Sequence, residues 1–376
     1  MHARTLIILI VAAALLLGVA LVAVSNRGPD PLEEPGRFAP DLESRLNDVT
    51  SITVSGETSF TLSRGADGWS IDEKGGYPAD PEKVRAALIG LARLDRVERK
   101  TSKPDLYDRL GVGGVGKPDS TVVALEADGA PVGEMILGKR DAAGAEQRYA
   151  RNADEASSWL VRGRLDLATD TLGWIDREIL RIPREDVASV SIEHPDGERL
   201  VVHRPDAETT DFVVDEIPEG SQLTRPSAAN GLGSSLSFLR LEDVRPDTGE
   251  VAEGIVVVIS TFDRMVATIR LVAEDDGTWA TFGFFAEADA PPGEGFVPDF
   301  EGEGPPPEPE VQAIIDKAND LERRLKPWSF RLADSAAAAF DKRVADYIEP
   351  IPAPDPPPAA TEEAGTDGTD TGEPGS

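Results

Sequence analysis

One stretch of the chain has the spacing of a phosphate-binding loop. Residues 111–117 read GVGGVGK and fit Gly-x4-Gly-Lys, in which backbone amides and a lysine surround phosphate groups. Such a loop also needs Ser or Thr after the lysine to hold Mg²⁺, a strand before it and a helix after it. Here Pro118 follows the lysine, the preceding DLYDRL is helical in pattern, and the pattern after it is that of a strand. We therefore interpret the stretch as a connection and predict no nucleotide site.

The three histidines are the next candidates for metal or acid-base chemistry. His2 lies before a long apolar run, His194 precedes a Pro-Asp-Gly turn, and His203 ends the strand predicted after that turn. His194 and His203 could approach each other across the hairpin and, with a carboxylate, offer the ligand types of a zinc site. The first half of the chain has no counterpart to either, and hairpin histidines are usually solvated. We predict that they hold no metal.

Carboxylates and cysteines indicate no site either. The chain has 69 acidic residues, so chance pairs of carboxylates are certain, and it has no Cys to serve as a nucleophile, a thiolate ligand or half of a disulfide. The Gly-x-Ser-x-Gly and His-Glu-x-x-His patterns are absent. The sequence thus predicts no catalytic residue, no cofactor and no metal ligand, and a protein that is not an enzyme.

The balance of charged residues argues against two classes of binding partner. With 38 basic and 69 acidic residues the formal net charge is −31. Nucleic acids and anionic membrane surfaces both select basic footprints, so the sequence predicts neither as a partner. Solubility is the simplest interpretation of the excess acid.

The run from Leu6 to Val24 is apolar throughout. As a helix it would be roughly 28 Å long at ~1.5 Å per residue, close to the ~30 Å hydrocarbon core of a bilayer. Arg4 and the α-amino group before the run outweigh a lone Arg27 after it, which favours residues 1–5 in the cytoplasm and the body outside. A cleaved signal peptide is the alternative, but its apolar region is typically shorter, ~7–15 residues. We predict an uncleaved single-pass anchor in the inner membrane with a periplasmic body.

The rest of the chain predicts an α+β body of two units. Residues 25–44 read as a tether, 45–180 as a first unit, 181–349 as a second unit with an acidic, Pro-rich insertion at 287–310, and 350–376 as a disordered tail. Period-two alternation of apolar residues predicts short, mostly antiparallel strands. In the first unit Asp80 and Pro81 predict the start of a covering helix.

The two units share one pattern of residues, which predicts a tandem duplication of a β-meander covered by a helix. In this alignment Ile52 corresponds to Val190, Leu62 to Val202, and Trp69 to Phe212, so both aromatic residues are expected to be buried. The helix of the second unit is expected around Leu232, Leu236 and Leu239, and a further helix at 311–325.

A set of stretches follows the N-terminal span: GWSIDEKGGYPADPEKVRAALIGLARL, LYDRLGVGGVGKP, ILGKR, RYAR and LGWIDREILRIPREDVASVSI. This set resembles a bacterial family of membrane-anchored, duplicated domains of unknown function, over nearly the whole chain from the span to about Ile348. Genes of that family often lie beside ABC-2-type transporter genes, in operons that also encode an auxiliary component similar to a gliding-motility protein. The resemblance implies ABC-type transporter subunits as partners and carries no catalytic residues.

Three functions remain open at this point. The first is a non-enzymatic accessory or scaffold protein of the envelope that binds a transporter. The second is a module that binds an envelope glycan or lipid, which would show a pocket. The third is an envelope hydrolase, which would show carboxylates with perturbed pKa values in a cleft.

The orientation of the anchor can be tested directly. A reporter fused after Ser376 should be active only outside the cytoplasm, because the positive charge before the span favours a cytoplasmic N-terminus. Reporter activity in the cytoplasm would contradict the predicted orientation.

Overall fold

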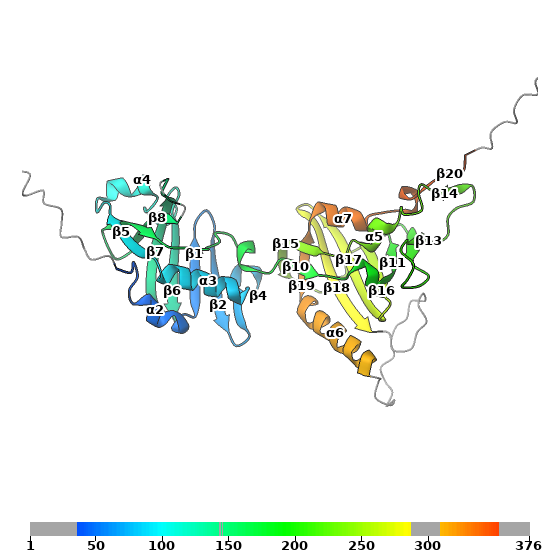
Figure 1. Ribbon diagram of the computed structural model, residues 1–376, viewed down its shortest axis with the longest axis horizontal. Helices are drawn as coiled ribbons and strands as arrows, with labels where there is room; N and C mark the ends of the chain where they lie inside the picture. Colours follow the sequence, from blue (N-terminus) through cyan, green and yellow to red (C-terminus); the bar gives the residue numbers. More distant parts are fainter. Residues whose placement is uncertain (1–35, 143, 145, 287–308, 353–376) are drawn as a thin grey trace, which may run out of the picture.

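The computed structural model describes residues 36–142, 144, 146–286 and 309–352, which form two lobes side by side, each built on a nine-stranded sheet (Figure 1). Every strand pairing is antiparallel and the helices are few, as predicted. Among the described residues no helix combines the length and apolar character that crossing a bilayer requires. The predicted span from Leu6 to Val24, residues 287–308 of the insertion and residues 353–376 of the tail lie outside the described part.

The first sheet has the order β4-β3-β2-β1-β6-β7-β8-β9-β5. Its strands are β1 Ser51–Ser55, β2 Ser59–Gly65, β3 Gly68–Ile71, β4 Tyr77–Pro78, β5 Asp95–Arg99, β6 Thr121–Ala127, β7 Ala130–Arg140, β8 Gln147–Asn152 and β9 Ser158–Arg162. The helices of this lobe are α2 Leu42–Arg45, α3 Pro81–Ala92 and α4 Tyr107–Leu110.

The second sheet has the order β10-β15-β19-β18-β17-β16-β11-β12-β13. Its strands are β10 Glu178–Leu180, β11 Val187–Glu193, β12 Arg199–His203, β13 Val213–Val214, β15 Leu239–Pro246, β16 Ile255–Thr261, β17 Met265–Glu274, β18 Gly277–Ala286 and β19 Trp328–Leu332. The helices here are α5 Asn230–Gly233, α6 Pro309–Leu325 and α7 Asp334–Phe340, and a separate pair joins β14 Ser221–Leu223 to β20 Ile348–Pro350.

Alternating residues build the core of the first lobe. Ile52 and Val54 of β1 are buried, and they face Leu62 and Phe60 of β2. The predicted helix start is confirmed, because the Asp80 side chain accepts hydrogen bonds from the two amides that follow Pro81. The apolar face of α3 then covers this side of the sheet.

The two sheets share a strand order. Without its edge strand β4, the first sheet has the order β3-β2-β1-β6-β7-β8-β9-β5. Without its edge strand β10 and taken from the other end, the second sheet has the matching order β13-β12-β11-β16-β17-β18-β19-β15. The registers agree with the sequence alignment, since Ile52 faces Leu62 in the first sheet and Val190 faces Val202 in the second.

The helix expected around Leu232, Leu236 and Leu239 is much shorter than predicted. Only four residues are helical, α5, and Leu239 already begins β15. The segment reads NGLGSS, and its Gly and Ser residues favour turns over helix. The apolar spacing was therefore satisfied by burial of the leucines in a series of turns.

The prediction that Trp69 and Phe212 are both buried is half wrong. Phe212 is 1% exposed, whereas Trp69 is only partly buried. The difference follows from α5, which lies directly on the Phe212 ring: a Cβ added at Gly233 would come within 2.3 Å of it.

Three predicted boundaries also change. The tether assigned to 25–44 contains Phe38 and Leu42, which are buried in the first lobe. Strand β10, assigned to the first unit, pairs with β15 of the second sheet. Pro350, assigned to the tail, is the last residue of β20. In each case a short segment places apolar side chains or main-chain groups against a neighbouring strand, which local composition does not reveal.

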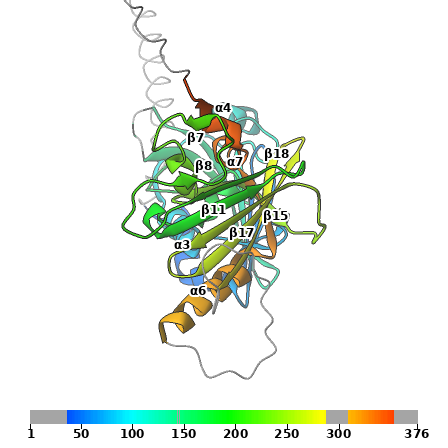
Figure 2. The same cartoon turned by 90° about the vertical axis from the view of Figure 1, so that its right-hand side faces the viewer.

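Helix α6 confirms the helix predicted at 311–325 and lies along the lower side of the second sheet (Figure 2). Strand β19 pairs with β18 only at Trp279 and Ala280. Beyond that point the Glu322 side chain accepts a hydrogen bond of 2.7 Å from the Phe284 amide. The helix thus covers a strand edge that would otherwise expose main-chain groups.

The lobes meet through an aromatic contact. The Tyr77 ring packs edge-on against Trp328 and Phe330, with ring centroids 5.0 and 6.2 Å apart. Burial raises the pKa of Tyr77 to about 12, so its neutral form is favoured there. Beside it Lys74 forms an ion pair of 2.5 Å with Asp243. One continuous hydrophobic cluster includes residues of both lobes, so the two sheets form one body.

A pair of neighbouring glycines allows this contact to be tested. Both Gly75 (φ +67°) and Gly76 (φ +86°) occupy the left-handed region, but a Cβ at Gly75 would also lie 2.3 Å from Pro246 Cγ, whereas a Cβ at Gly76 meets nothing within 4 Å. Gly76→Ala should cost only the backbone strain, about 1–2 kcal/mol, and Gly75→Ala about 1–3 kcal/mol more in the free energy of unfolding. Equal losses in urea unfolding would show that the lobes do not press on each other here.

Candidate functional site

The segment that precedes β1 is bonded to the open edge of β5. The Phe38 amide donates a hydrogen bond of 2.7 Å to the Leu94 carbonyl, and the Arg96 amide donates one of 2.9 Å to the Gly36 carbonyl. Arg37 and Asp95 lie opposite each other, and their side chains form an ion pair of 2.7 Å. The first described residues therefore act as an additional edge strand.

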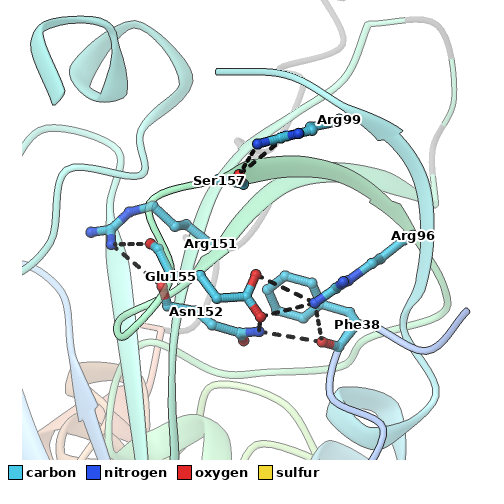
Figure 3. Close-up of polar contacts among 7 residues, drawn as sticks. All are labelled: Phe38, Arg96, Arg99, Arg151, Asn152, Glu155 and Ser157. Carbon is cyan, nitrogen blue, oxygen red and sulfur yellow. Dashed lines mark hydrogen bonds and ion pairs between the residues drawn. The ribbon is translucent and has the colours of Figure 1, made fainter. Parts of the chain in front are cut away.

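Three polar side chains hold this segment, and we call Arg96, Asn152 and Glu155 together the N-terminal clamp (Figure 3). Arg96 and Asn152 both donate to the Phe38 carbonyl, at 3.5 and 3.3 Å, and both donate to Glu155 at 3.0 Å. The Arg96 guanidinium lies 4.6 Å from the centroid of the Trp159 ring. Because Phe38 is fully buried, the clamp fixes both the main chain and the side chain of this segment.

Arg151 orders the turn that carries Glu155. Its guanidinium donates to the carbonyls of Asn152, Ala153 and Glu155, and its Nε donates to the Val112 carbonyl. The guanidinium also stacks over the Tyr107 ring at 4.6 Å. At the far side of the turn Arg99 donates to Ser157 at 2.8 Å (Figure 3). The side chains of this cluster bond to one another and to main-chain groups, so they hold neighbouring segments of the chain together.

The glycine-rich stretch at 111–117 is a connection, as interpreted. Helix α4 precedes it and strand β6 follows it, which is the reverse of the order in a phosphate-binding loop. Val112 is buried, and a Cβ at Gly138 of β7 would lie 2.2 Å from the Leu110 carbonyl. The stretch thus packs closely on the outer side of the first sheet.

The prediction that His194 is solvated is wrong. Its side chain is 1% exposed, and Nε2 lies 3.1 Å from the Lys342 carbonyl. The loop after α7 covers the β11–β12 turn, where Arg343 pairs with Asp196 at 2.9 Å and with Glu198. This loop lies about 150 residues away in the chain, so only the tertiary structure places it there.

His194 and His203 do not converge. His203 pairs with Ser189 at the opposite end of the hairpin, and its Nδ1 lies 2.8 Å from Asp215 Oδ1. In the sequence alignment the corresponding residues of the first unit are Ser63 and Asp72, and Ser63 Oγ donates a hydrogen bond of 2.8 Å to Asp72 Oδ2. Among the described residues no group of three potential metal ligands occurs.

The second lobe has a groove of about 240 Å³ between β10 and α6. Leu180, Met265 and Leu321 contribute apolar side chains to it, and charged groups of both signs line it as well: Glu178, Arg181, Lys317, Asp320 and Arg324. Beside β10, Phe238 is 51% exposed and the Arg181 guanidinium lies 4.8 Å from its ring centroid. Sequence reasoning found neither this groove nor the N-terminal clamp, because each joins residues distant in the chain.

Residues 69–254 match the model of a family described as Domain of unknown function (DUF4340). The match begins in β3 of the first sheet and ends between β15 and β16 of the second, so this similarity includes parts of both lobes. It agrees with the predicted resemblance to a family of domains of unknown function. No curated protein and no solved structure matches the chain.

The N-terminal clamp leads to a prediction about local stability. Arg96→Met should speed amide hydrogen exchange at Phe38 by about tenfold or more, because it removes charge-assisted bonds that hold this segment. Arg199→Met is a matched control, since Arg199 bonds to Ser191 on the second sheet. Unchanged exchange at Phe38 in the Arg96 variant would mean that strand pairing alone holds the segment.

Proposed function

We propose that the protein is a membrane-anchored, non-enzymatic accessory or scaffold protein of the cell envelope that holds a partner near the membrane. The observation that carries this proposal is the N-terminal clamp. The chain that would lead from the Leu6 to Val24 anchor enters the body as a bonded edge strand, so a load on the anchor passes into a sheet rather than into a loose linker. A body held in this way is concentrated toward membrane partners.

The proposed partners are subunits of an ABC-type transporter, as the family resemblance implies. The continuous core supports this role, because a body of two joined sheets keeps a fixed geometry between its anchored end and any surface that binds the partner. The exposed Phe238 beside Arg181 is a suitable contact point, since aromatic and arginine side chains dominate many protein interfaces.

We further propose that the body arose by tandem duplication. The shared strand order supports this, and so does a register shift in the corresponding strand pairing near one end of each sheet. The β5–β9 register shifts between Arg96 and Glu98, and the β15–β19 register shifts between Leu241 and Asp243. Bulges are positional features that related folds retain. Each sheet is also bordered by a segment that precedes its first long strand, 36–38 in one lobe and β10 in the other.

The second candidate function is an envelope ligand-binding module for a glycan or lipid, and the groove between β10 and α6 favours it. Its apolar and charged lining could hold an amphipathic ligand, although its volume lies below the ~300–1,000 Å³ of most ligand sites. An envelope hydrolase that acts at the same groove is the less favoured function.

The scaffold proposal is tested by separating anchor from body. Replacing residues 1–24 with a cleavable signal peptide should abolish co-purification of transporter subunits from native membranes and impair function, while the released body still folds. Fusing the body to an unrelated single-span anchor of the same orientation is the control, and it should restore both.

The variant Phe238→Ala should weaken recovery of the partner without lowering the stability of the body, because this side chain is half exposed. Full function of the released, anchorless body at native expression would overturn the scaffold proposal. Saturable binding of a glycan or lipid that is lost on changing Leu180 and Leu321 would favour the ligand-binding module.

A further inference from the structure

Two arginines of the first lobe face each other across neighbouring strands. Arg140 at the end of β7 and Arg148 near the start of β8 are direct cross-strand partners. Such partners have Cα atoms ~4.5–5.5 Å apart, and like charges in this position destabilise a sheet. A pairing of this kind needs a compensating interaction.

The described residues do not supply that compensation. Arg148 Nη2 donates a hydrogen bond of 3.1 Å to the Gly138 carbonyl, while its Nε is buried and has no partner in the described part of the chain. Arg140 has no hydrogen bond or ion pair with any residue that the structure describes. The nearby acid Asp141 is bonded to Tyr149, and Asp119 pairs with Lys139.

The electrostatics of Arg148 agree with this geometry. Burial, and secondly the Arg140 charge, lower the pKa of Arg148 to about 10. A buried charge is ordinarily paired, because removing it from water without a partner is costly. The two arginines are therefore a pair of cations whose counter-ion is not a carboxylate of the described chain.

The fold does not require arginines here. In the corresponding strand pairing of the second sheet, between β17 and β18, Ala273 faces Thr278. The corresponding strand pairing thus forms with small neutral residues, so the fold does not depend on the two charges.

The strongly acidic character of the chain does not extend to this region. Residues 93–164 contain 13 basic and 12 acidic residues, whereas the remainder contains 25 basic and 57 acidic residues. Charges farther away than ~8–10 Å are largely screened at physiological ionic strength. An anion can therefore approach this part of the first lobe in spite of the net charge.

We propose that Arg140 and Arg148 form an oxyanion site that takes a phosphate group. Guanidinium groups are planar and donate paired hydrogen bonds to tetrahedral oxyanions, so two of them on adjacent strands can share one phosphate. The exposed Arg140 supplies access and the partly buried Arg148 supplies a weakly hydrated donor. The phosphate can come from a lipid headgroup or from a free phosphate compound, and the chemistry of recognition is the same.

The test is thermal unfolding of the full chain in phosphatidylcholine nanodiscs, titrated with inorganic phosphate against chloride at constant ionic strength. The unfolding temperature should rise and saturate with phosphate but not with chloride. Arg148→Gln and Arg140→Gln should each raise the apparent Kd for phosphate by at least about tenfold. Both variants are expected to fold, because each removes one member of a like-charge pair.

A second arm uses nanodiscs that contain phosphatidylglycerol. Stabilisation by this lipid that depends on both arginines, without a response to inorganic phosphate, identifies a headgroup as the source, and a response to inorganic phosphate identifies a free compound. Arg199→Gln is the matched control and should behave as the unchanged protein does. No response in either arm, or an equal response in the arginine variants, would overturn the proposal.

Discussion

The contact of Tyr77 with Trp328 and Phe330 joins two sheets into one body, and the relative placement of every surface depends on it. Tyr77 of the short strand β4 packs against two aromatic rings of β19, and Lys74 in the preceding turn forms an ion pair with Asp243. Gly75 permits the close approach, since any side chain there would collide with Pro246. One hydrophobic cluster includes buried residues of both lobes, and Tyr77 and Trp328 pack against it.

The protein covers its strand edges with segments of its own chain. Residues 36–38 occupy the edge of β5, strand β10 occupies the edge of β15, and α6 covers the part of β18 that β19 leaves open. Open edges attract other strands, so covering them suppresses aggregation. The same device gives the first lobe its N-terminal clamp, in which a segment that protects an edge also connects the body to the preceding chain.

Arginine has several distinct roles in the first lobe. Arg96 and Arg151 donate to main-chain carbonyls and stack on aromatic rings, so their charge is distributed over many partners. Arg140 and Arg148 instead face each other with few partners in the described chain. A count of basic residues therefore indicates little about function. An arginine whose donors are already bonded to main-chain carbonyls is not available to a ligand, whereas one with few such bonds is.

The sequence by itself determined the antiparallel strands and the start of α3 at Asp80, because alternation, caps and turns act over a few residues. It also excluded the 111–117 stretch as a phosphate loop, from the order of its neighbours. The length of α5 was wrong because apolar spacing cannot distinguish a helix from successive turns when Gly and Ser fill the gaps. The burial of His194, the N-terminal clamp and the Arg140–Arg148 pair were decided only by the tertiary structure. Each joins residues on different strands or loops. Which side chains meet there depends on the register between strands, and no single segment encodes that register.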